Sequence, residues 1–306
     1  MPRFLFKAFQ FMWFKNLTLY RLKKWEETPE SLAEKLTKRA LQSCGSADMQ
    51  TVGWVSPKSE GDPIIHQLGS QLLISLGIEK KLLPATVVNQ FTKARATEIE
   101  EQQGYKPGRK ELKEIKENMV DELLPRAFTI RSKINAWIDP VDGWMIIDAA
   151  NLSKADEMVT QLTKTLDGFA VSLIKTKSSP SSTMTSWLSA NEAPASFTID
   201  QDCELRGRGE SGSTVRYVKH ALELDEISKH LKAGKEVTRM AMTWNDKLSF
   251  VIHENLQLKK ITPLDLIKDQ ADINSEDDSF DTDFAMMTGE LKKLILSIVN
   301  ELGGEI

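Results

Sequence analysis

The chain has 306 residues, of which 41% are hydrophobic and 27% charged. These proportions are ordinary for a soluble globular protein and exclude a disordered or fibrous chain. The two cysteines, Cys44 and Cys203, lie far apart, which excludes a disulfide framework and favours a reducing cytoplasm. No apolar run reaches the length needed to cross a bilayer, so no membrane partner is expected.

Charge is distributed unevenly along the chain, although the net charge is only −4. Residues 1–133 carry 22 basic and 16 acidic side chains, a net charge of +6. Residues 134–262 carry 15 against 17, and residues 263–306 carry 3 against 11, so their net charges are −2 and −8. A polyanion responds to local potential, so a net acidic chain can still bind one. The alternative is that these charges only solvate ordinary helix faces and an acidic surface.

The first region comprises residues 1–11, which are apolar apart from Arg3, Lys7 and Gln10. They lack the small-residue cleavage site of a signal peptide. We expect them to be an extension outside the folded domain or the result of a misassigned start codon. A weak amphipathic contact with a membrane is the alternative.

A central α+β region is predicted over residues 12–84 and 125–170. A strand is expected over residues 13–22. Thr28 can cap a helix that begins at Pro29 and runs to about residue 41. Residues 44–63 are rich in turn-forming residues and flank a short strand at Val52–Val55. Further strands are expected at residues 71–76, 129–138 and 144–149, the last two joined by a turn at residues 140–143, and a helix follows them.

Residues 85–124 have helical periodicity on both sides of a breaker cluster at residues 104–108. This pattern predicts a helical hairpin with a thin apolar stripe and many charges. Because such a hairpin is poorly covered by its own core, we expect it to project as an arm or pack on a partner.

A second α+β region is predicted over residues 171–306. It is expected to contain strands at residues 237–244 and 248–253, a helix at residues 263–268, and polar loops at residues 175–186 and 206–213. A final helix is expected from a cap at Thr288 to the Gly303-Gly304 pair. Its apolar stripe is either core or a dimer seam. The complete pattern predicts an α+β fold of antiparallel sheets with flanking helices.

The sequence contains no clear catalytic motif. The four histidines lack metal-ligand spacing, and neither a Walker A loop nor a Gly-x-Ser-x-Gly elbow occurs. Carboxylates at Asp139, Asp142 and Asp148 leave a metal-dependent nuclease open as an alternative function. The acidic segment 265–283 leaves open a protein-interaction module. It includes Asp277, Asp278, Asp281 and Asp283, which lack the pattern of a calcium loop. The expectation is a protein that is not an enzyme, holds no metal and needs no cofactor.

The basic residues are the feature of the sequence that indicates a function. They decorate the expected hairpin, the strand that follows it and a later segment. Regularly placed cations suit the phosphates of duplex DNA, and the chain shows no recognition helix that would read bases. The predicted DNA contacts are Lys93, Arg95, Arg109, Lys110, Lys113, Lys116, Arg126, Arg131, Lys133, Arg216 and Lys219.

Four segments, in family order, resemble the bacterial recombination-associated protein family RdgC. They are Met12–Asn16, Cys44–Met49 with Val52–Val55, Leu123–Phe128 and Phe280–Leu291. The resemblance implies a nucleoid-associated homodimer that closes into a ring around double-stranded DNA without reading its sequence. It also implies that the protein restrains the recombinase RecA, either by direct contact or by competition for DNA.

The same resemblance implies a gate in the ring, formed by Arg126 and Phe128 with Lys219 and His220. The family often carries a different residue at the place of His220. From the residues alone, Phe128 is either a core side chain or an exposed aromatic anchor of an interface.

Overall fold

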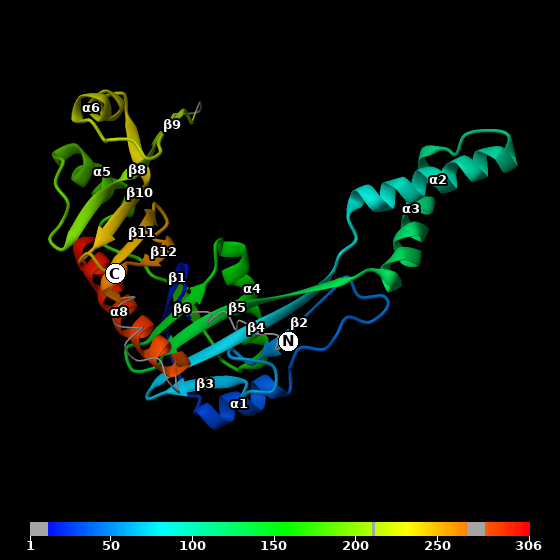
Figure 1. The fold of residues 1–306 in the computed structure, drawn as a ribbon, viewed down its shortest axis with the longest axis horizontal. Coiled ribbons are helices and arrows are strands. Elements are labelled where there is room, and N and C mark those ends of the chain that lie inside the picture. Colours follow the sequence, from blue (N-terminus) through cyan, green and yellow to red (C-terminus); the bar gives the residue numbers. More distant parts are fainter. Residues whose placement is uncertain (1–11, 210–211, 268–278) are drawn as a thin grey trace, which may run out of the picture. The chain divides into compact units, whose positions relative to one another are not determined.

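The computed structural model describes residues 12–209, 212–267 and 279–306, which form two compact units (Figure 1). The first unit comprises the described residues up to Glu26, then Gln67–Leu73 and Ala136–Ile306. The second comprises Glu27–His66 and Ile74–Asn135. The proposed extension at residues 1–11 lies outside the described residues.

The first unit is built on an antiparallel sheet, which confirms the α+β prediction. Strand β7 (Val171–Leu173) pairs with β1. The main path of the sheet runs, in spatial order, through β6 (Trp144–Asp148), β1 (Asn16–Leu22), β12 (Leu258–Pro263), β11 (Leu248–His253), β10 (Lys235–Trp244), β8 (Phe197–Gly207) and β9 (Thr214–Tyr217).

Helices α5 (Pro180–Ala190), α6 (Leu224–Lys232) and α8 (Ser279–Glu301) contribute to the hydrophobic core on one face of this sheet. The apolar stripe of α8 is core, since Leu291 and Leu294 are 0% exposed and pack in the same cluster as Met240 of β10. Helix α4 (Leu152–Thr165) was predicted and buries Ala155, Met158 and Leu162.

The first unit differs from the predictions in several places, and strands β7, β8 and β9 and helix α6 were not expected. The expected polar loop at residues 175–186 is wrong in part, because Ser179 caps helix α5 by accepting a hydrogen bond from the Ser182 amide at 3.2 Å. Helix α8 begins at Ser279, so Thr288 does not cap it but donates to the Phe284 carbonyl at 2.8 Å inside the helix. Strand β12 was missed, and it includes Pro263, where a helix was expected over residues 263–268. Of that range, residues 265–267 are helical and residue 268 lies outside the described residues.

The second unit contains α1 (Pro29–Thr37) and β2 (Gln50–Val55), together with most of β4 (Gln71–Lys81) and β5 (Thr129–Asp139). Strand β3 (Ile65–Leu68) pairs with β4. The Thr28 cap is confirmed, since its hydroxyl accepts a hydrogen bond from the Ser31 amide at 3.2 Å. Strands β2 and β4 pair antiparallel, with Gly53 opposite Gly77.

The predicted helical hairpin is confirmed as α2 (Ala85–Gln103) and α3 (Arg109–Leu123), which pack on each other. Gly104, at φ 81°, ends α2 in the left-handed conformation that glycine favours. Only Val88 in α2 and Ile115 in α3 are buried. The short 3-10 helix η1 (Leu124–Arg126) then leads into β5.

Candidate nucleic-acid interface

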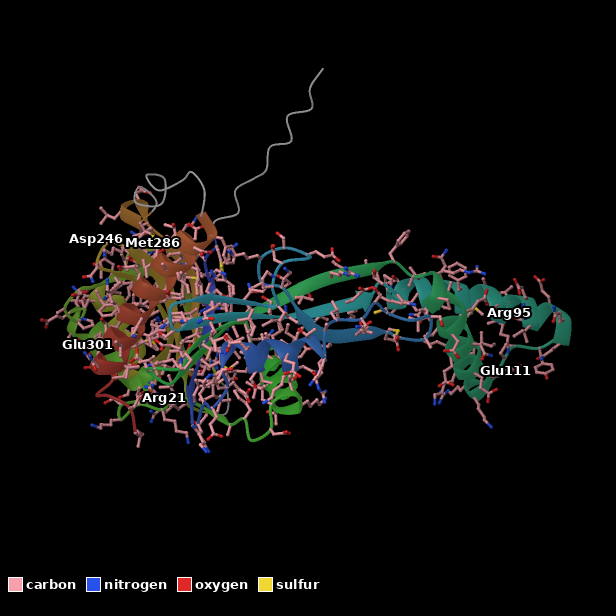
Figure 2. The ribbon with its side chains drawn as sticks, turned by 90° about the horizontal axis from the view of Figure 1, so that it is seen from below. Arg21, Arg95, Glu111, Asp246, Met286 and Glu301 are labelled. Atoms are coloured by element: carbon pink, nitrogen blue, oxygen red, sulfur yellow. The ribbon has the colours of Figure 1, made fainter. Side chains whose placement is uncertain are left out.

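The hairpin carries six of the predicted DNA contacts, and all six side chains are exposed. Figure 2 shows Arg95 and Glu111 together on this hairpin. Arg95 forms an ion pair with Glu98 at 2.6 Å, and Lys113 lies 3.6 Å from Glu117. Residues 85–124 carry seven basic and eight acidic side chains, so the hairpin has a net charge of −1. Its cations are therefore interspersed with carboxylates, and the hairpin is not a uniformly basic surface. The four side chains with no ion pair or hydrogen bond among the described residues are Lys93, Arg109, Lys110 and Lys116.

Two predicted contacts on β5 already have partners within the second unit. The Nε of Arg131 donates to the buried Glu79 carboxylate at 2.7 Å, and a second ion pair joins Arg131 to Glu60 at 3.8 Å. The hydrogen bond from Arg131 is the main reason that the pKa of Glu79 falls below its usual value. Lys133 donates to the carbonyls of Ser56 and Lys58 at 2.8 and 3.3 Å. Both residues therefore hold the loop after β2.

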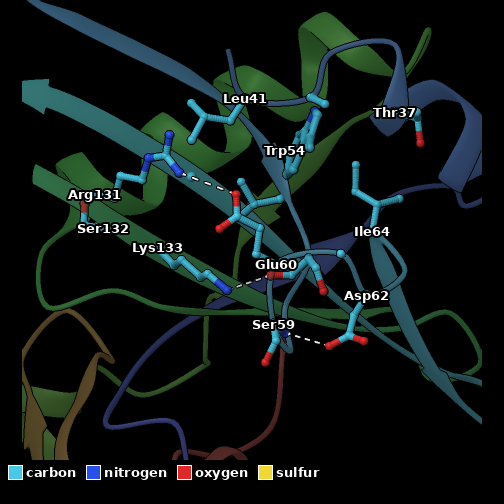
Figure 3. Close-up of a pocket in the computed structure, with 15 residues that line it drawn as sticks. Thr37, Leu41, Trp54, Ser59, Glu60, Asp62, Ile64, Arg131, Ser132 and Lys133 are labelled. Atoms are coloured by element: carbon cyan, nitrogen blue, oxygen red, sulfur yellow. Dashed lines mark hydrogen bonds and ion pairs between the residues drawn. The ribbon is translucent and has the colours of Figure 1, made fainter. Parts of the chain in front are cut away.

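Arg131 and Lys133 also lie at the rim of a cavity of about 460 Å³ (Figure 3). Its apolar lining includes Leu41, Trp54 and Ile64. Gly77 leaves room for the Val55 side chain, since a Cβ at residue 77 would lie 2.6 Å from it. The Val52–Val55 motif thus contributes to a pocket whose two cations are engaged with the loop that borders it.

Phe128 is an exposed residue, with 84% of its surface accessible, so the core alternative for this side chain is wrong. Its carbonyl accepts a hydrogen bond from the Leu82 amide at 2.7 Å. Leu82 and Ile130 are also exposed, by 50% and 53%. Arg126 lies in η1, is exposed, and has no ion pair or hydrogen bond in the part of the chain that the structure describes. Large apolar side chains gathered in this way are typical of an interaction surface.

The other two proposed gate residues lie on the first unit, just after β9. Lys219 is exposed, and its amide, at φ 50°, donates to Asp202 at 2.7 Å. The Nδ1 of His220 lies 2.7 Å from the Ala221 carbonyl, and its ring centroid is 5.9 Å from that of Tyr217.

Arg216 belongs to a row of side chains that crosses the first unit's sheet. Arg216 on β9 is paired with Glu204 on β8. Glu204 is also paired with Arg239 on β10, and Arg239 is paired with His253 on β11. Directly paired residues of antiparallel strands share one face of the sheet. This is the face opposite the core, because the alternating residues Cys203, Met240 and Ile252 belong to the hydrophobic cluster.

Glu204 is the centre of this row, and only 4% of its side chain is exposed. It forms ion pairs with Arg216, with Arg239 at 3.1 Å and with Arg206 at 3.3 Å. Burial alone would raise the pKa of Glu204, but hydrogen bonds from Arg216 and Thr238 and the charge of Arg239 bring it below its usual value. Arg206 also pairs with Glu254 at 3.6 Å, so three guanidinium groups face two carboxylates and the cluster keeps a net positive charge.

Two lysines of β12, Lys259 and Lys260, lie beside this row, and the pairing of β12 with β11 and β1 sets their position. Lys259 of β12 stands opposite Val251 of β11 and Asn16 of β1, and Lys260 follows it. Burial, followed by the charges of Lys259 and Arg239, lowers the pKa of His253 to about 4. The imidazole is therefore neutral at neutral pH and sits in a positive potential.

Arg239, Lys259 and Lys260 were not among the predicted contacts. The signal that could have identified Arg239 is the strand alternation, since residues 239 and 241 alternate with the apolar Met240 and Met242. Lys259 and Lys260 could not be identified in the same way, because they lie on strand β12, which was not predicted.

The carboxylates considered for a metal site have structural roles. Asp139 accepts hydrogen bonds from the amides of Val141 and Asp142, both at 3.1 Å, and forms an ion pair with Lys292 at 3.3 Å. Asp148 accepts from the Asn16 amide at 2.8 Å. Across residues 12–209, 212–267 and 279–306, no three His, Cys, Asp or Glu side chains are grouped to hold a metal ion. Asp277 and Asp278 lie outside the described residues.

Comparison with known proteins decides the family. The family model described as "Putative exonuclease, RdgC" matches residues 12–305. The chain belongs to the RdgC family. Proteins named recombination-associated protein RdgC from Janthinobacterium sp. (strain Marseille) and Herminiimonas arsenicoxydans are 51% and 50% identical to it, over 96% of this chain and 99% of each relative. A protein of the same name from Bordetella pertussis is 50% identical over the same shares.

The RdgC family match begins at residue 12, where the description of the structure also begins. Among the helices that the structure describes, none is long and apolar enough to span a membrane.

Proposed function

We propose that this RdgC-family protein binds double-stranded DNA through its phosphates, without reading sequence, and restrains RecA during recombination. The observation that carries the proposal is the concentration of guanidinium and ammonium groups on the open face of the first unit's sheet. Cations at cross-strand spacing match the phosphates of a polyanion, and phosphate contacts carry no sequence information. The names of the relatives, which place them in recombination, support the second half of the proposal.

We further propose that two copies close into a ring around the duplex and that the protein associates with the nucleoid. Self-association through a two-fold axis uses the same patch on both copies. The exposed patch of Phe128, Leu82 and Ile130, next to the free Arg126, has the composition of such an interface. A duplex already encircled is less available to a recombinase filament, so no nucleotide, metal ion or covalent step is needed.

The test is RecA-driven strand exchange with increasing amounts of the purified protein. We expect exchange to fall as the duplex becomes saturated, and to recover when excess unrelated duplex is added as a competitor. Undiminished exchange on a saturated duplex would contradict a restraining role. Exchange that falls but does not recover with competitor DNA would indicate direct contact with RecA.

A second candidate function is exonuclease activity, which the family description favours. The test is to incubate end-labelled duplex with the protein and with magnesium or manganese ions. Loss of terminal nucleotides that depends on the divalent ion would support the enzyme. Binding without shortening of the duplex would favour the DNA-restraining role.

A further inference from the structure

A concave pocket of about 330 Å³ lies on the open face of the first unit's sheet. Its lining includes Asn16, Arg239, His253, Lys259 and Lys260, with Asp202 as the one acidic side chain among the residues around it. Strands β1, β8, β10, β11 and β12 all contribute, so the pocket is set by the sheet register and not by a single loop.

The two lysines of the pocket have no counter-ion of their own. Within the part of the chain that the structure describes, neither the Lys259 nor the Lys260 ammonium forms an ion pair or a hydrogen bond. Asp202 already accepts the Lys219 amide at 2.7 Å, and Glu204 is occupied by three arginines. Asp202 keeps its own negative charge, so Arg239, Lys259 and Lys260 outnumber the acidic side chains that line the pocket by two.

His253 adds a hydrogen-bond donor to these charges. A neutral imidazole carries one N–H, and among the described residues no side-chain hydrogen bond engages this ring. Its backbone is fixed, since the amide donates to the Gln257 carbonyl at 3.0 Å. A half-buried donor beside two unpaired ammonium groups and a guanidinium is the set of partners that a phosphate group takes.

We propose that this pocket seats one phosphate group, held by Lys259, Lys260, Arg239 and the imidazole of His253. The inference rests on the proposed DNA binding, and it identifies a specific seat on the sheet for a phosphate. The same chemistry would accept a backbone phosphate of the duplex or a free phosphate ion, and the test separates the two.

The first experiment follows the His253 ring by NMR in the full-length protein at neutral pH, while inorganic phosphate or a short duplex is added. Lys259→Gln/Lys260→Gln is the test variant. Lys229→Gln/Lys232→Gln, on α6 and away from the pocket, is the control. We expect the duplex to shift the His253 signals in the wild type and in the control, but not in the test variant. A shift with inorganic phosphate as well supports a seat for any phosphate. A shift with duplex alone supports a seat for backbone phosphate only. No shift with either overturns the proposal.

The second experiment measures duplex affinity against salt concentration for the same variants. Each lost phosphate contact removes about 0.9 from the slope of log K against log salt. Because the two lysines hold one phosphate, removing both should reduce the slope by about 0.9. The control should keep the wild-type slope. An unchanged slope in a test variant whose thermal melt is normal would overturn the pocket while leaving the proposed function intact. Failure of the wild type to bind any duplex would instead overturn the proposed function.

Discussion

Glu204 is the residue on which the charge balance of the open sheet face depends. It is buried, it holds three guanidinium groups, and its folded pKa lies below its usual value. Removing one partner of a buried charged network is destabilising, because the remaining charges lose their compensation. Removing this negative charge also makes the face more positive, so DNA affinity should rise while stability falls.

We therefore expect Glu204→Gln to lower the free energy of unfolding at pH 7 by about 1–3 kcal/mol. Because the folded pKa is depressed, the contribution of Glu204 is present above its unfolded value near pH 4.3 and is lost as the pH falls further. Urea denaturation at several pH values should show the wild type and the variant converging below that pH. Glu192→Gln, at an exposed glutamate, should match the wild type throughout. A difference in the free energy of unfolding between wild type and Glu204→Gln that stays constant down to low pH would contradict this role of the Glu204 charge.

Phe128 is the second residue of interest, because a change at an exposed side chain can affect assembly without affecting folding. With 84% of its surface accessible, it contributes little to the core of its own chain. An exposed aromatic beside an arginine is typical of an interface anchor.

Phe128→Ser should leave the melting temperature within about 2 °C of the wild type, as expected for a surface change. If the side chain closes a ring, retention on closed circular DNA after a salt challenge should fall more than affinity for a short linear duplex. Val141→Ser, at an exposed apolar residue that is 75% accessible, is the matched control and should change neither. A large drop in melting temperature without a selective loss on circles would contradict a gate.

At the scale of elements, the apolar stripe of helix α8 is part of the core of the first unit. Leu294 is 0% exposed within the first unit's cluster, whereas Leu296 on the same helix is 42% exposed. Leu294→Ala should lower the free energy of unfolding by about 2–5 kcal/mol through the cavity that it leaves. Leu296→Ala should change it by less than about 1 kcal/mol. Chemical denaturation measures the free energy of unfolding of both variants. Equal losses in the two would contradict the assignment of Leu294 to the core and Leu296 to the surface.

Elements with a strong local signal could be predicted from the sequence. The hairpin α2–α3 has helical periodicity on both sides of a glycine-rich breaker, and α1 has a capping threonine followed by proline. Helix α5 could not be predicted in the same way, because serine and threonine fill its surface and only Met184 and Leu188 mark its buried side. Strand β12 is short, and left-handed Lys260 interrupts its alternation.

Contacts between distant segments could not be predicted at all. Gly53 of β2 is an example, because a glycine within a strand allows another backbone to approach closely. Only the structure identifies that neighbour as the backbone of Leu41, 2.5 Å from where a Cβ would lie. The open sheet face has the same origin, since Arg216, Arg239 and Lys259 come from three separate strands and are brought together by register alone.

At the scale of the whole molecule, the charge pattern matters more than the net charge. The chain is acidic overall, and its hairpin is close to neutral, yet the sheet of the first unit gathers cations on one face. If this face binds DNA as proposed, binding should release counter-ions and depend strongly on salt and little on base sequence. Most of the acidic segment 265–283 falls on residues 268–278, which lie outside the described residues. Its role as a protein-interaction module stays a prediction.

The measurement that tests this account most directly is the affinity of the full-length protein for two unrelated duplexes of equal length, across a range of salt concentrations. We predict that the two affinities agree within about tenfold, or about 1.4 kcal/mol, and that both fall steeply with salt at about −0.9 per phosphate contact. A preference for one sequence beyond that range, or an affinity that barely responds to salt, would contradict binding to the phosphate backbone.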